Sequence, residues 1–123
     1  MTVALANVTF DCRDAAALAG FWSAATGRPV DDGATSEFAS IGLPAEDGRP
    51  AWLFNQVPES KTAKNRVHLD VNAGHGATDR RAAVRSHMSR LVAAGATVLR
   101  EMQEESGWWI VMADPEGNEF CLQ

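Results

Sequence analysis

Residues 5–12 alternate apolar and polar side chains, which is the pattern of a half-buried β-strand. Asn7, Thr9 and Asp11 occupy the polar positions, and the residues between them are apolar. One face of this predicted strand is therefore dry, and the other presents polar groups.

A helix is predicted directly afterwards, over residues 15–26. Leu18 and Trp22 belong to a set of apolar residues spaced three and four positions apart, so the helix has one apolar side that can cover the first strand. Asp14 is suited to cap its N terminus, and Gly27 to end it in a left-handed conformation.

Two short strands follow, over residues 36–43 and 51–57. Residues 31–35 fit either a loop or the start of another strand. Residues 58–64 are polar and without periodicity, which indicates a surface linker.

The second half of the chain repeats this order. A strand is predicted over residues 66–71, then a helix that begins after Thr78 or Asp79 and continues to about residue 94, then a strand over residues 97–104. Alternation divides the first of these strands into an apolar face with Val67, Leu69 and Val71, and a polar face with Arg66, His68 and Asp70. Four arginines on the helix are interpreted as a solvated face: Arg80, Arg81, Arg85 and Arg90.

The chain ends in a predicted hairpin. Its turn contains Pro115, which presets φ, and Gly117, which accepts a positive φ, and a last strand follows over residues 118–123. Both halves then read strand, helix, strand, strand, strand. The sequence predicts an α+β fold in which two paired βαβββ modules form a curved mixed sheet around a half-barrel cleft, with the helices outside. Residues 1–123 are expected to form one domain, with module one at about 1–57, the linker at 58–64 and module two at about 65–123.

Composition narrows the function. The net charge of −5 disfavours a nucleic-acid partner, and no apolar run is long enough to span a membrane. Cys12 and Cys121 are the only cysteines and lie in no CxxC pair, so free thiols in a cytoplasmic protein are expected.

Several motifs occur in an order that is specific: NVTFDCRD at residues 7–14, Phe-Trp and a glycine in the first helix, NRVHLD at 65–70, AAGATV at 93–98 and MADPEGNEF at 112–120. With them the chain resembles the vicinal oxygen chelate superfamily, and within it the glyoxalase-like domains, over nearly its whole length. The resemblance implies paired βαβββ modules, a cupped cavity and often a homodimer. Its members include lyases and isomerases, dioxygenases, thiol transferases, and metal-free proteins that sequester antibiotics such as bleomycin, so the fold alone selects no function.

Metalloenzymes of the superfamily place His, Glu or Gln at one inward position on the first and last strand of each module. In this chain those positions fall on Asn7, Trp52, Arg66 or its neighbour His68, and Cys121. Tryptophan and arginine are not metal ligands and amide oxygen is a weak one, so the standard site is absent and no cofactor is expected. A rearranged divalent-metal site of His68, Glu119 and Cys121 is the minor alternative.

The predicted function is the binding of a small organic ligand in the cleft of a homodimeric protein. The predicted ligand-binding residues are Asn7, Asp11, Trp52, Phe54, Arg66, Asp70 and Cys121. The alternative is a lyase or isomerase in which His68, with Glu119, transfers protons, since imidazole both takes and gives a proton near neutral pH. Either Asp70 or Glu119 would orient or tune the imidazole. A structural or regulatory dimer with a vestigial cleft is the third hypothesis. Trp52 and Phe54 have a second interpretation, which is that they pack in the core. Asp11 and Asp70 also have a second interpretation, which is that they hold loops in place.

Overall fold

The computed structural model describes residues 1–123, which form two helices and seven strands. The strands form two mixed sheets, one of three strands and one of four. The predicted α+β class is confirmed. The chain divides into two compact units, Met1–Ser60 and Lys61–Gln123, called the first unit and the second unit below.

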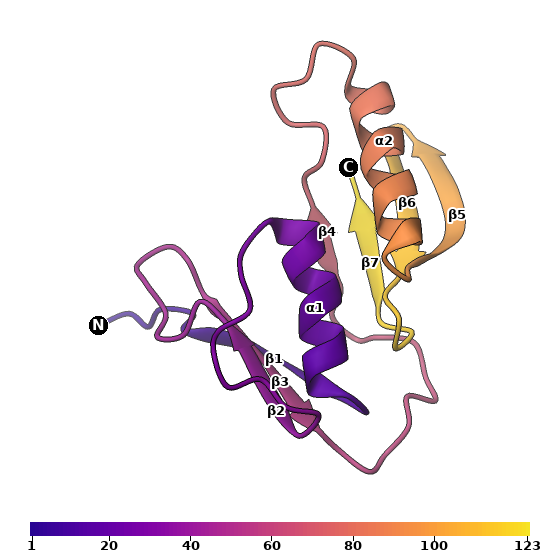
Figure 1. Cartoon of the computed structure of the whole chain (residues 1–123). Helices are drawn as coiled ribbons and strands as arrows, with labels where there is room; N and C mark the ends of the chain where they lie inside the picture. The colour runs from indigo at the N-terminus through magenta and orange to yellow at the C-terminus, as the bar shows by residue number, and fades with distance from the viewer. The chain divides into compact units, whose positions relative to one another are not determined.

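The first unit contains β1 (Asn7–Cys12), α1 (Ala15–Thr26), β2 (Phe38–Ile41) and β3 (Ala51–Gln56) (Figure 1). Its sheet has the order β1-β3-β2, in which β1 runs parallel to β3 and β2 antiparallel to it. The crossover from β1 to β3 is needed because two parallel strands cannot be joined by a tight turn.

Both predicted ends of α1 are confirmed. An oxygen of Asp14 accepts the backbone N–H of Ala17 at 3.0 Å, and this cap is worth about 1 kcal/mol. Gly27 ends the helix at φ 73°, a value that residues with a side chain rarely adopt. The apolar side of α1 is buried as expected, with Leu18 and Trp22 each 1% exposed.

The second strand expected of the first module is reduced to a single bridge between Val30 and Ile41. Two local features explain the shortening. Pro29 has no N–H to give to a ladder. The N–H of Asp31 is donated to the carbonyl of Ser40, but beyond this bond it is the carboxylate of Asp31 that accepts the N–H groups of Gly42 and Leu43, at 3.2 and 2.9 Å.

The second unit contains β4 (Leu69–Val71), α2 (Arg80–Ala93), β5 (Thr97–Glu104), β6 (Gly107–Ala113) and β7 (Glu119–Leu122). The sheet order is β4-β7-β6-β5, with β4 parallel to β7 and the other pairs antiparallel. Figure 1 shows α2 along one face of this sheet. Neither helix of the protein has the length and apolar character needed to cross a membrane.

The strand predicted over residues 66–71 is only half as long in the structure. It begins at Leu69, and Val67, which was expected on a dry face, is 78% exposed. Because β7 is also short and pairs with β4 only from Phe120 to Leu122, the residues before Leu69 have no partner strand. Alternation in this segment therefore overstated the length of the strand.

Residues on α2 divide between the core and the surface. Val84 and Leu91 are buried, whereas Val92 is 44% exposed. Asp79, one of the two predicted caps, is the N-cap and accepts the N–H of Ala82 at 3.0 Å.

The arginines of α2 are exposed, as expected, but they do more than meet solvent. The guanidinium carbons of Arg80, Arg81 and Arg85 lie 5.7, 4.7 and 5.3 Å from the ring centre of Trp108, which is 3% exposed. The indole N–H of Trp108 is donated to Glu101, which also accepts from Arg85 at 2.8 Å. These contacts join α2 to β5 and β6.

The predicted closing hairpin forms around one buried carboxylate. Asp114 is 3% exposed and accepts the backbone N–H groups of Glu116 and Asn118, at 2.9 and 3.0 Å, and the side-chain amide of Asn118. Gly117 has φ 85° and its N–H is donated to the carbonyl of Asp114. The turn is therefore held by side-chain and backbone acceptors of a single residue.

Candidate functional site

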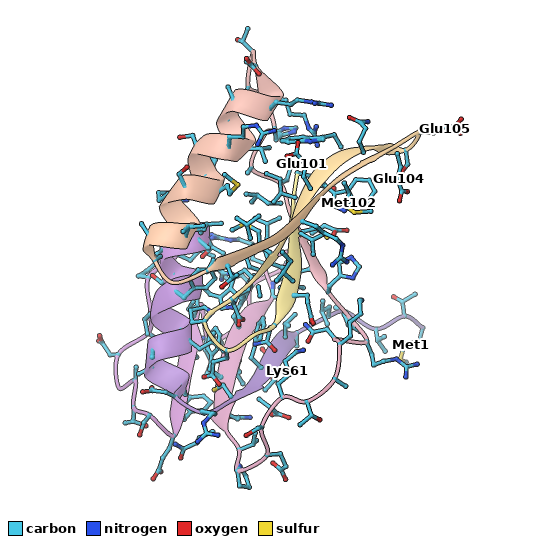
Figure 2. All side chains as sticks on the ribbon, turned by 90° about the vertical axis from the view of Figure 1, so that its right-hand side faces the viewer. Met1, Lys61, Glu101, Met102, Glu104 and Glu105 are labelled. Atoms are coloured by element: carbon cyan, nitrogen blue, oxygen red, sulfur yellow. The ribbon has the colours of Figure 1, made fainter.

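The sheet of the second unit has two chemically different faces. Successive residues of β6 alternate, so that Trp108 and Ile110 turn toward α2 while Trp109 and Val111 turn away from it. The same alternation operates on β5, where Glu101 meets Arg85 of α2 and its neighbour Met102, labelled beside it in Figure 2, belongs to the other face. We call the face turned away from α2 the open face.

A cavity of about 660 Å³ lies on the open face. No residue of α2 lines it. Its apolar lining consists of Leu99, Met102, Trp109, Val111 and Phe120. Its polar lining consists of Lys64, His68, Asp70, Arg100, Ser106, Glu119, Cys121 and Gln123. The size lies within the range of small-molecule sites, which are apolar with a few polar groups that fix orientation.

Strand register places four of these residues in one row. Arg100 on β5 pairs with Val111 on β6, Val111 pairs with Cys121 on β7, and Cys121 pairs with Asp70 on β4. Three interstrand spacings separate the ends of the row, a distance of roughly 14 Å. The floor of the cavity is therefore cationic at the β5 end, apolar in the middle and acidic at the β4 end.

His68, Asp70 and Cys121 meet at the β4 end of the row. Nε2 of His68 lies 3.4 Å from Oδ1 of Asp70, and one ligand atom from each of the three residues lies within 4.8 Å of the other two. Burial raises the pKa of the Cys121 thiol, and the carboxylate of Asp70 raises it further, while Arg100 and Lys64 lower it. In the absence of a metal, the side chain of Cys121 is therefore a protonated thiol at neutral pH.

Glu119, the predicted partner of His68, is engaged elsewhere. Its carboxylate accepts the backbone N–H of Asn65 at 3.0 Å and pairs with Lys61 at 3.1 Å. Burial works against its negative charge, but these hydrogen bonds and the lysine hold its pKa below the usual value. Because Glu119 fastens the chain before β4 to β7, the carboxylate beside His68 is that of Asp70.

The remaining predicted residue of the second unit, Arg66, is exposed and does not line the cavity. It precedes β4, so no strand pairing directs its side chain to the open face. Its role in binding stays a prediction.

The four predicted residues of the first unit do not share one face of its sheet, and their roles in binding stay predictions. Asn7 and Asp11 pair with Ala51 and Asn55 across the sheet, so the alternate residues Trp52 and Phe54 point to the opposite side. The face of a strand residue is difficult to predict from sequence, because a register error of one residue reverses it.

Trp52 and Phe54 belong to an aromatic cluster of the first unit. Phe10 lies 5.9 Å from Trp52 and 5.3 Å from Phe54 between ring centres, in stacked geometry, and Trp22 of α1 lies 5.1 Å from Trp52. Phe54 is fully buried. The core interpretation therefore fits Phe54, and Trp52 is half-buried beside it.

Nine of the residues that line the cavity were not among the predicted site residues, and they include Lys64, Arg100, Met102 and Trp109. Alternation within residues 107–113 was sufficient to find Trp109, because one of two adjacent tryptophans in a strand must leave the core. No sequence signal marked Arg100, since the register of β5 shifts between Val98 and Arg100.

The chain matches the family model of the glyoxalase-like domain over residues 7–123. Among curated proteins no match is found.

Solved structures share the fold at low sequence identity. A glyoxalase/bleomycin resistance protein/dioxygenase family enzyme from Burkholderia phytofirmans is 21% identical, with a TM-score of 0.73 and 97% of this chain and 96% of that chain covered. A mutant of the fosfomycin resistance protein FosX from Listeria monocytogenes, complexed with Mn(II) and 1S,2S-dihydroxypropylphosphonic acid, is 16% identical, with a TM-score of 0.74 and coverage of 100% and 90%. Lactoylglutathione lyase from Agrobacterium tumefaciens is 16% identical, with a TM-score of 0.63 and coverage of 98% and 92%.

Proposed function

Because the chain belongs to the glyoxalase-like domain family, in which one fold carries many activities, we propose that its function resides in the open-face cavity and consists of binding a small organic molecule there. The observation that carries the proposal is the cavity of about 660 Å³ with an aromatic wall and polar ends. An open space of this size argues against the vestigial-cleft hypothesis.

Trp109 is the residue expected to contribute most to ligand affinity. Its ring offers a large flat apolar surface, and it is half-buried, so part of that surface remains to be covered. Burying apolar surface stabilises a complex by about 25 cal/mol per Å². Contact with one face of an indole is therefore enough to change affinity measurably.

We expect the neutral fluorescent probe N-phenyl-naphthylamine to bind with a stoichiometry of one per chain, and Trp109→Ala to weaken that binding at least about tenfold. Fluorescence titration measures both quantities. Val92→Ala is the matched control, since Val92 is an exposed apolar residue of α2 on the other side of the sheet. Equal affinity of the Trp109→Ala variant and the wild type would refute the cavity as the binding site.

A second candidate function is proton-transfer chemistry of the lyase or isomerase kind, favoured by the contact between His68 and Asp70. In this proposal Asp70 orients the imidazole, and His68 takes a proton from a ligand carbon or oxygen and returns it to another. Of the two carboxylates that the sequence suggests for this role, Asp70 lies beside His68, whereas Glu119 is bound by Lys61 and Asn65. Glu119 instead positions the segment that carries His68.

A divalent metal is implied by relatives such as the Mn(II) complex, and the residues of the β4 end fit one. Tetrahedral ligands of zinc lie about 3.5 Å apart, and the imidazole, carboxylate and thiol here are already within 4.8 Å of one another. His68, Asp70 and Cys121 would hold the ion, and a thiolate in the set favours zinc over manganese. When bound, such an ion supplies Lewis acidity toward an oxygen of the ligand.

We expect the protein to bind one zinc ion per chain with an affinity that rises with pH. Zinc binds the thiolate, and both burial and Asp70 raise the pKa of Cys121, so a proton must leave as the metal enters. The affinity for zinc should rise by up to about tenfold per pH unit, until the pH reaches the pKa of the thiol in the metal-free protein. Competition with a chromogenic chelator at three pH values measures it.

Cys121→Ser is expected to weaken zinc binding and to remove most of this pH dependence. Cys12→Ser is the matched control, because Cys12 is the other buried cysteine, forms no disulfide and lies in the first unit. An affinity for zinc that is unchanged in Cys121→Ser would exclude the thiol as a ligand.

A further inference from the structure

A local irregularity of β5 brings two consecutive residues to the same cavity. In a regular strand Leu99 and Arg100 would point to opposite faces. The register between β5 and β6 shifts between Val98 and Arg100, and both Leu99 and Arg100 line the open-face cavity. A β-bulge re-aims side chains in this way and is frequent beside binding sites.

The cation delivered by this irregularity has no acidic partner in the protein. Arg85 and Lys61 each form an ion pair with a glutamate, whereas Arg100 forms none and makes no hydrogen bond. The other cation of the cavity, Lys64, likewise has no ion pair. The nearest acidic member of the row is Asp70, three strands away at the opposite end. The guanidinium is therefore available to an anion from outside the chain.

The neighbours of Arg100 limit what such an anion can be. Val111 follows it in the row, and Met102 and Trp109 pair with each other across β5 and β6 beside it. A small hydrated anion would leave this apolar surface uncovered. A molecule that carries its negative charge on a flat apolar body would satisfy both features, because the planar guanidinium fork matches the two oxygens of a carboxylate.

We propose that Arg100 determines ligand specificity by binding the carboxylate, or another oxyanion, of an amphiphilic ligand whose apolar body lies on Trp109. The inference rests on the proposed function of the cavity. It places the anionic end of the ligand at β5 and the opposite end at His68 and Asp70. It also gives the bulge a function, since in a regular strand either Leu99 or Arg100 would point away from the cavity.

The test compares naphthoate with naphthamide, two probes of nearly equal shape of which only the first is charged. Isothermal titration calorimetry is performed at pH 7.5 with a chelator present, so that no metal binds the carboxylate. We expect naphthoate to bind wild-type protein at least about tenfold more tightly than naphthamide, because one charge-assisted hydrogen bond contributes a difference of that size. Arg100→Gln should remove that preference by weakening naphthoate alone.

Two further variants sharpen the result. Arg100→Lys keeps the charge without the fork, and should retain part of the preference. Arg90→Gln makes the same change of net charge on α2, away from the cavity, and should leave both affinities unchanged. If Arg90→Gln loses the preference for naphthoate to the same extent as Arg100→Gln, the effect is one of net charge and the proposal is overturned.

The outcomes separate this inference from the proposed function. If wild type binds both probes equally and Trp109→Ala weakens both, the cavity is a binding site and the role of Arg100 is refuted. If neither probe binds, the proposed function fails, and the inference fails with it. Replacing naphthoate by naphthyl phosphate distinguishes a carboxylate site from one that prefers phosphate, and tighter binding of the phosphate would assign the oxyanion to that class.

Discussion

Trp108→Ala is expected to lower the free energy of unfolding by about 4 kcal/mol, the largest loss among the substitutions considered. Trp108 is 3% exposed, and its removal leaves a cavity between the sheet and α2. The change also deprives three arginines of the ring beneath them and leaves Glu101 without the indole N–H. Chemical denaturation followed by circular dichroism measures the loss.

The adjacent residue provides the control. Trp109→Ala removes the same side chain one position later, on the open face, where the ring is half-buried and borders a cavity that already exists. Its effect on unfolding should stay below about 1.5 kcal/mol, while its effect on probe binding is large. Equal losses of stability in the two variants would contradict the division of the sheet into a structural face and a binding face.

Asp114→Ala is expected to lower the free energy of unfolding by about 3 kcal/mol. The carboxylate accepts two backbone N–H groups and a side-chain amide within a turn where it is almost fully buried. Removing it leaves those donors without their acceptor, and the turn joins β6 to β7, which carries Cys121. Equilibrium denaturation in urea measures the change.

Two comparisons test the explanation. Asp114→Asn keeps one acceptor oxygen and should lose roughly half as much. Asp14→Ala removes an aspartate that accepts one helix N–H at an exposed site, and should lose about 1 kcal/mol. If Asp114→Ala loses no more than Asp14→Ala, the hydrogen bonds of the hairpin do not have the importance assigned to them.

Local features of the fold were predictable from sequence because they depend on neighbouring residues. The caps of both helices follow from side chains that reach backbone groups three positions away, as Asp14 and Asp79 do. The closing hairpin follows from the φ preferences of Pro115 and Gly117. Such signals need no knowledge of distant strands.

Features that depend on pairing between distant strands were less predictable. The face on which Trp52 lies is set by its register with Val8, forty-four positions earlier, and an error of one residue reverses it. The shortness of β4 depends on the length of β7, which pairs with it. A strand's own sequence contains neither fact.

The candidate site shows the same distinction. His68, Asp70 and Cys121 were selected from sequence, and the structure places them together. The engagement of Glu119 by Lys61 and the backbone of Asn65 could not be predicted, because these contacts join residues that are 58 and 54 positions apart in the chain. The position of Arg100 required the irregular register of β5 to be seen.

The bulge in β5 has a consequence for how the protein changes over generations. Deleting a single codon there would restore the regular ladder while leaving the pairings on either side intact, from Thr97 with Ala113 to Glu104 with Gly107. The cavity would lose one of its two consecutive side chains, and with it either an apolar contact or the cation. If the cavity binds a ligand as proposed, a single deletion here would change which ligand it prefers without breaking the sheet.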